Sequence, residues 1–404
     1  LLCVRNLWRR HRRKIFVTVG VLGSGYLLYK LYGAHRHGVQ ELERELAVQR
    51  ESEELMKAQM QAHFENIQRI SDVTLPLAMH DLSCRITEEL DLSHLLERLI
   101  QGKGQPNALT QSEKLDLWSR LKILSFTRMT LSVWTTTMLN LYTKVQVNIL
   151  GRHLYIDTAR SLGISDSVVT TTVFLLYTLL VFHVSYQRLL LNNSFFSLLL
   201  YMQESGDVVG KEDQKKFLDS VDFLSQHGMP ALITDMEAAT NEVLKGKQLS
   251  TSFNSTTLHE TIMRILNTFM SKGTPNSWIK YMIPEDVKSF STSSGSDDQV
   301  PSDVTEFEQL MMEAQAVLSS AEFGSIVEMS LKAVVDTLVE LMGAKFSGGS
   351  VTAGVPLARV LPQVAQMCPL LLEEPSKNQF IQIIKNIQEV ELFFTLLYAN
   401  MPHA

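Results

Sequence analysis

The sequence has few of the residues that cross-link or interrupt a small fold. Its 404 residues include three cysteines, eleven prolines and twenty glycines. Cys3, Cys84 and Cys368 are odd in number, lie far apart and form no CxxC pair, so neither a disulfide framework nor a zinc site is indicated. Unpaired cysteines fit a protein that faces the reducing cytosol.

A surplus of basic residues and the common catalytic motifs are absent as well. The 37 Lys and Arg residues against 43 Asp and Glu give a net charge of −6, which argues against nucleic acid as the main partner because phosphate binding needs a basic surface. No HExxH, GxSxG, P-loop, dinucleotide-binding or EF-hand pattern occurs. We therefore predict a protein that is not an enzyme and takes no cofactor, metal or small-molecule substrate.

What the chain does have is helical periodicity. Leu, Met, Gln, Glu and Lys recur at helical spacings over long segments, no convincing alternating strands are found, and 45% of the residues are hydrophobic. The sequence predicts an all-α fold, an elongated helical bundle with an N-terminal transmembrane helix. Helices are expected at 38–70, from 76 to about 100, and at 113–151, 213–226, 230–247, 256–270, 304–320, 323–342, 357–372 and 375–401.

The N-terminus is typical of a basic tail followed by a membrane anchor. Residues 1–14 carry six basic and no acidic residues, and 15–32 are almost uncharged, which is about the length that a helix needs to cross a bilayer. A cleaved signal peptide is the alternative, but the apolar run is long for one and ends in tyrosines that suit a membrane interface. We assign the anchor to Ile15, Phe16, Val17, Val19, Val21, Leu22, Tyr26, Leu27 and Leu28, and targeting to Arg9, Arg10, Arg12, Arg13 and Lys14. Residues 33–404 are then the cytosolic bundle.

Residues 168–202 differ in composition from the sequence around them. They hold one charged residue, Arg188, no Gly and no Pro, and are rich in Leu, Phe, Val and Thr. By hydropathy alone, 168–186 is a second candidate for a transmembrane helix.

A Trp between two lysines marks the candidate binding face. Thr110 stands three residues before Glu113, the spacing of a capping box, and opens the longest periodic segment. On this helix Lys114, Trp118 and Lys122 recur every four residues and share one face. Such a face is either a core Trp with lysines at its rim or a groove for an acidic amphipathic helix, and spacing alone does not separate the two.

A longer motif surrounds this face. The segment KLDLWSRLKILSFTRMTLSVWTTTMLNLYTKVQVNILGRHLYID (114–157) resembles the peroxisomal biogenesis factor three family, and its plant members in particular. The resemblance continues through QKKFLDSVDFLSQHGMPALI (214–233) and SWIKYMIPED (277–286). It implies a single-pass protein of the peroxisomal membrane with the bulk of the chain in the cytosol, although the positive-inside rule alone would keep the basic tail there.

The resemblance further implies a docking receptor for peroxin nineteen, the soluble chaperone that delivers peroxisomal membrane proteins for import and insertion. It favours recognition over a core role for the Trp face, which would receive an amphipathic helix of the chaperone. The expected partner-binding residues are Trp118, Lys114, Lys122, Leu96, Leu115 and Leu121. Segment 168–202 has no counterpart in the family and resembles translated non-coding sequence, with a genuine second membrane segment as the alternative. The alternative function is a signal-anchored structural tether or adaptor of another organelle.

Overall fold

A computed structural model describes residues 44, 47, 50, 74–104, 110–161, 211–274, 276–284, 305–346 and 354–399. These residues are mostly helical, which confirms the predicted helical class. After a helix at 74–89, the elements are α2 (Ser93–Gly104), α3 (Gln111–Ser161), α6 (Lys211–Asp219), α7 (Met229–Leu244), α8 (Ser255–Met270), α10 (Glu306–Ser319), α11 (Ala321–Phe346), α12 (Leu357–Leu371), α13 (Gln379–Lys385) and α14 (Gln388–Ala399).

Short irregular elements join these helices. A 3₁₀ turn η1 (Ser220–Asp222) and a π turn η2 (Leu224–Gly228) connect α6 to α7, and a 3₁₀ turn η3 (Ser277–Tyr281) follows α8. Two strands of two residues each, β1 (Ser252–Phe253) and β2 (Val355–Pro356), pair antiparallel with Ser252 opposite Pro356.

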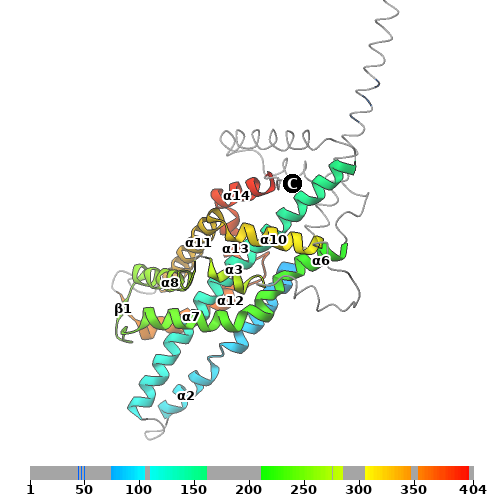
Figure 1. Cartoon of the computed structure of the whole chain (residues 1–404). Helices are drawn as coiled ribbons and strands as arrows, with labels where there is room; N and C mark the ends of the chain where they lie inside the picture. The colour runs from blue at the N-terminus through cyan, green and yellow to red at the C-terminus, as the bar shows by residue number, and fades with distance from the viewer. Residues whose placement is uncertain are drawn as a thin grey trace, which may run out of the picture.

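The 51-residue helix α3 is the axis of the fold (Figure 1). At 1.5 Å per residue it is about 75 Å long. Helices α2, α6, α7, α8 and α10 to α14 all pack against it. Between 125 and 150 all but four of its residues are buried, so this part of the helix has no solvent-exposed face.

Hydroxyl residues make such complete burial possible. Thr130, Thr135, Thr137 and Thr143 each donate a hydrogen bond of 2.8 Å to the carbonyl four residues earlier. A buried hydroxyl without a partner would destabilise the fold, and this local bond satisfies it without a neighbouring helix. The middle of α3 can therefore alternate apolar and hydroxyl side chains and still be covered on every side.

An aromatic cluster anchors the main core to α3. Trp134 is fully buried and meets Phe269, Trp278 and Tyr281 edge-on, with ring centroids 5.5, 6.4 and 6.3 Å away. Edge-to-face pairs of this kind stabilise a core beyond the burial of their area. Gly228 passes so close to the backbone of Tyr281 that an added Cβ would lie 2.2 Å from its carbonyl oxygen.

The predicted membrane segments lie outside the residues that the structure describes. This holds for the basic tail 1–14, the anchor 15–32 and the apolar segment 168–202. Among the described residues, no helix combines the length and apolar character needed to cross a membrane.

Candidate functional site

Helix α2 and the start of α3 form an antiparallel hairpin that projects from one end of the bundle (Figure 1). A small satellite core holds the hairpin together, separate from the main core. It consists of Leu92, Leu95, Leu99, Leu117 and Leu121. The leucines around α2 recur at intervals of three and four, the spacing that gives a helix one apolar face.

The outer side of the hairpin leaves large apolar residues in solvent. Leu96 and Ile100 on α2 are 43% and 68% exposed, and Leu115 on α3 is 54% exposed. The hairpin thus carries three of the seven large hydrophobic residues that are exposed in the described part of the chain. Exposed apolar residues that gather in one place mark interaction surfaces, whereas single ones do not. We call Leu96, Ile100, Leu115 and Trp118 the hairpin surface.

Trp118 lies where the hairpin joins the bundle. Its side chain is half-buried and packs against both the satellite core and the main core. Part of the indole therefore supports the fold and part remains in solvent. Lys114, one turn earlier, is half-buried as well.

The structure differs from the sequence-based expectation at Lys122 and Leu121. Lys122 is 8% exposed, and its ammonium donates to the carbonyl oxygens of Leu244 at 3.3 Å and Lys247 at 2.8 Å. Leu244 is the last residue of α7, where the helix dipole favours a cation, and Lys247 lies in the turn that follows. Burial lowers the pKa of the Lys122 side chain. Leu121 is 4% exposed, within the satellite core.

Ile100 is a surface residue that the sequence reasoning missed. It is the most exposed of the large hydrophobics in the described residues. It stands four residues after Leu96, so the two share one side of α2. The four-residue spacing is visible in the sequence, but the helix predicted from 76 ends at about residue 100, so Ile100 was not assigned to the binding face.

The comparisons with known proteins agree on one family. The Peroxin-3 family model matches residues 104–400. Peroxisome biogenesis protein 3-2 of Arabidopsis thaliana is 50% identical over 401 residues, which cover 99% of both chains, and protein 3-1 of the same plant is 48% identical. Peroxisomal biogenesis factor 3 of Homo sapiens is 25% identical over 98% of this chain and 97% of its own.

The chain belongs to the Peroxin-3 family. Membership supports a role in peroxisome biogenesis, and the plant resemblance seen in the sequence is confirmed. The Peroxin-3 family is not a known enzyme family.

The motif that carries the Peroxin-3 resemblance holds α3 to its neighbours. Gln146 donates to the hydroxyl of Ser220 at 3.0 Å, and Arg152 donates to the carbonyl of Leu397 at 3.1 Å. Arg152 and His153 both pair with Glu313 on α10. These contacts tie α3 to η1, α10 and α14, so the motif reflects packing in this part of the fold.

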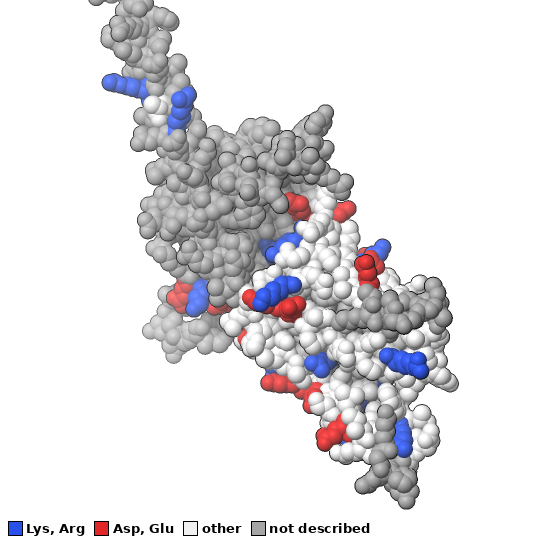
Figure 2. All heavy atoms as spheres, turned by 180° about the vertical axis from the view of Figure 1, so that it is seen from behind, with Lys and Arg blue, Asp and Glu red and all other residues white. Residues whose placement is uncertain are grey.

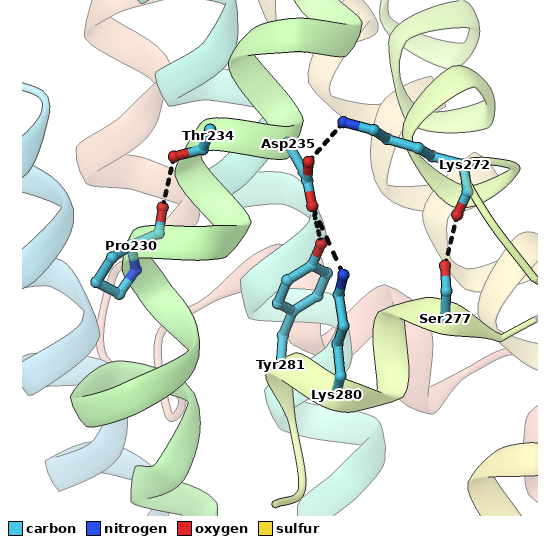
Figure 3. Close-up of polar contacts among 7 residues, drawn as sticks. All are labelled: Pro230, Thr234, Asp235, Lys272, Ser277, Lys280 and Tyr281. Carbon is cyan, nitrogen blue, oxygen red and sulfur yellow. Dashed lines mark hydrogen bonds and ion pairs between the residues drawn. The ribbon is translucent and has the colours of Figure 1, made fainter. Parts of the chain in front are cut away.

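A polar cluster around Asp235 also holds neighbouring elements of the fold together (Figure 3). The Asp235 carboxylate pairs with Lys272 at 2.5 Å and Lys280 at 3.8 Å, and accepts a hydrogen bond from the Tyr281 hydroxyl. Burial acts to raise the pKa of Asp235, but the bonds from Lys272 and Tyr281 outweigh it and hold that pKa below its ordinary value. Both carboxylate oxygens of Asp235 therefore have partners. These contacts connect α7 to η3 and to the residues that follow α8.

A metal site is not found in the described parts of the chain. No group of three or more His, Cys, Asp or Glu residues there could hold a metal ion. Figure 2 shows the molecule from behind relative to Figure 1. On that side the acidic and basic side chains of the described residues are interspersed. The hairpin surface is therefore the strongest candidate for a partner-binding site in the described part of the chain.

Proposed function

We propose that this Peroxin-3 family member is a docking receptor in the peroxisomal membrane that captures peroxin nineteen, the chaperone of peroxisomal membrane proteins. Capture would concentrate cargo at the bilayer and so support its import and insertion. The observation that carries the proposal is the hairpin surface, where Leu96, Ile100 and Leu115 are exposed on the hairpin that also carries Trp118.

The geometry of the hairpin favours a helical occupant. Two antiparallel helices that share only a five-leucine core leave one side open, and a third amphipathic helix closes such a pair into a three-helix unit. The partner helix would then bind through its own apolar residues, which recur at helical spacing. Trp is the residue most enriched among interface hot spots, and Trp118 lies at the inner end of the surface.

The energy available is moderate. Covering the exposed halves of three aliphatic side chains contributes roughly 1 kcal/mol each, and the partner's facing residues contribute a similar amount. Association itself costs at least about 4 kcal/mol. Affinity therefore depends strongly on Trp118 and on the charges around it.

A matched pair of double variants tests the docking role. Leu96→Ala with Leu115→Ala should weaken binding of the chaperone's N-terminal helix to the full-length protein about tenfold or more, because the removed atoms are exposed contacts. The control is Leu392→Ala with Leu396→Ala on α14, whose side chains are 45% and 40% exposed and lie away from the hairpin. Equal affinity of both variants and the wild type would overturn the proposal.

Trp118→Ala serves as a third variant, and it should affect stability as well as binding. Because Trp118 packs against both cores, the substitution should lower the melting temperature modestly in addition to weakening binding by about 2 kcal/mol. The melting temperature is therefore measured on the same sample as the affinity.

The proposed topology places residues 15–32 in the bilayer and the bundle in the cytosol. The glycosylation sequon at Asn254, Ser255 and Thr256 reports on it, because Asn254 is exposed. The Asn254 side chain caps α8 by accepting from the Thr257 amide at 2.8 Å, so Thr256→Ala is the variant that removes the sequon without removing the cap. We expect no glycan in cells; a glycan that is lost on Thr256→Ala would place the bundle across the membrane.

A further inference from the structure

The turn that follows α7 lies beside the hairpin surface. Lys122 stands one helical turn after Trp118 on α3, about 6 Å along the axis. Its ammonium reaches the carbonyls of Leu244 and Lys247, which fixes the intervening residues next to this part of α3. Gly246 permits the reversal, since its φ of +83° lies in the left-handed region.

Positive charge collects at this turn. The side chain of Lys245 is exposed, and that of Lys247 donates to the Thr261 hydroxyl at 2.8 Å and lies 5.1 Å over the ring of Phe253. Together with Lys122, three ammonium groups gather at the end of α7. Within the residues that the structure describes, none of the three forms an ion pair with a carboxylate.

The end of α7 does not account for all of this charge. A helix C-terminus is equivalent to about half a negative elementary charge, which a single ammonium already exceeds. Lys122 makes the direct contacts with the carbonyls and so fulfils the capping role. Near Lys247, Arg264 adds further positive charge and Glu260 offsets part of it. The turn is thus a local excess of positive charge on a chain whose net charge is −6.

We infer that the 245–247 turn is a basic rim of the hairpin surface that recognises carboxylates on the polar flank of the partner helix. This inference rests on the proposed docking function and assigns the partner an acidic edge on the side that faces α7. Lys122 acts as a positioning residue, because its ammonium donates to the Leu244 and Lys247 carbonyls and so holds the turn in place. Lys245 is the contact residue, because it is exposed and makes no ion pair in the described structure. Charges at an interface rim act mainly on association rate and on salt dependence.

The experiment measures association of two synthetic peptides with the full-length protein in detergent at low and high salt. One peptide is the chaperone's amphipathic N-terminal helix, and the other has its Asp and Glu residues replaced by Asn and Gln. The variants are Lys245→Gln, Lys245→Glu and, as the matched control, Lys332→Glu, an exposed lysine on α11. Melting temperatures are recorded for all three, since Lys245 is the C-cap residue of α7.

For the acidic peptide at low salt we expect Lys245→Glu to lower the association rate and affinity about tenfold, Lys245→Gln to act in the same direction to a smaller extent, and Lys332→Glu to match the wild type. The neutral peptide should not distinguish Lys245→Glu from the wild type, and high salt should shrink the difference. If Lys245→Glu binds the acidic peptide like the wild type while Leu96→Ala with Leu115→Ala does not bind, the basic rim is wrong and the docking function stands. If both bind like the wild type, the docking function itself fails.

Discussion

Replacing Lys122 by Met tests whether its ammonium is a buried cap or a surface charge. The substitution keeps a flexible apolar chain of similar length but removes the ammonium that donates to the carbonyls of Leu244 and Lys247, of which the Leu244 carbonyl keeps the Lys247 amide as a donor at 3.1 Å. Hydrogen bonds from a charged donor contribute about 1.5–3 kcal/mol net, and the cost of desolvating the ammonium, visible in its lowered pKa, offsets part of that loss. We expect the free energy of unfolding to fall by about 1–2 kcal/mol. Lys114→Met, the control two helical turns earlier on the same face of α3, should stay within about 0.5 kcal/mol of the wild type.

Charge reversal at the same position should be far more damaging. In Lys122→Glu a carboxylate would face two carbonyl oxygens and the negative end of α7 in a site that is 8% exposed. An uncompensated buried charge typically costs about 3–5 kcal/mol. Lys122 was expected from the sequence to bind the partner, but because it is buried, charge reversal there should mainly destabilise the fold, whereas at the half-buried Lys114 it should mainly slow association with an acidic partner.

Urea unfolding of the full-length protein in detergent, followed by far-UV circular dichroism, measures these differences. The reasoning is refuted if Lys122→Met is as stable as the wild type and Lys122→Glu changes only the association rate, because the side chain would then face solvent. A loss of stability that is equal for Lys114→Met and Lys122→Met would also refute it, since only Lys122 caps α7.

Two further substitutions address the core. Burial, with the nearby charge of Lys385, lowers the pKa of Lys144 to about 8 despite Glu391, so the folded state holds this proton less tightly than the unfolded state does. Lys144→Met should therefore raise the free energy of unfolding at pH 7 by about 1–2 kcal/mol, and the gain over the wild type should shrink from pH 8 upward and vanish above pH 10.5, where both states of the wild type are neutral; a gain that does not change with pH would contradict this cause. Gly228→Ala should cost about 2 kcal/mol or more, because the new methyl group meets the backbone of Tyr281, and near-UV circular dichroism should report the disturbed aromatic cluster; an unchanged melting temperature would rule out that close approach.

The sequence predicted the existence of most helices better than their ends. The capping box at Thr110 and Glu113 is present, with the Thr110 amide donating to the Glu113 carboxylate at 2.7 Å. The helix expected from 76 to about 100 is instead broken at 90–92, because Asp91 accepts from the Ser93 amide and starts α2 afresh. Pro76 did not mark the start of a helix, because residues 74 and 75 are already helical.

A second break was also missed near the C-terminus. The helix expected at 375–401 is divided into α13 and α14, and it begins only at Gln379. Asn378 sets that start, because its buried side chain accepts from the amides of Phe380 and Ile381 at 3.0 and 3.2 Å. An Asn in a polar stretch is weak evidence for a cap until its partners are known.

For the candidate site, the sequence predicted a shared helical face but not the environment of that face. Helical spacing placed Lys114, Trp118 and Lys122 on one face, and that geometry holds. Spacing says nothing about what lies opposite the face, and the two carbonyls that Lys122 contacts come from 122 and 125 residues further along the chain. The two lysines therefore differ in burial although their local sequence pattern is the same.

The separation of the two cores supports the proposal that the hairpin is a docking surface. Leu96 and Leu115 are held in place by five leucines that belong to the hairpin, while the main core is built around α3 and the Trp134 cluster. Exposed apolar atoms on the hairpin can therefore serve a partner without being needed for folding. Trp118 and Lys122 are where the two parts meet, since the first packs on both cores and the second binds the end of α7. Substitutions at these two residues should disturb binding and stability together, whereas those at Leu96, Ile100 or Leu115 should separate the two properties.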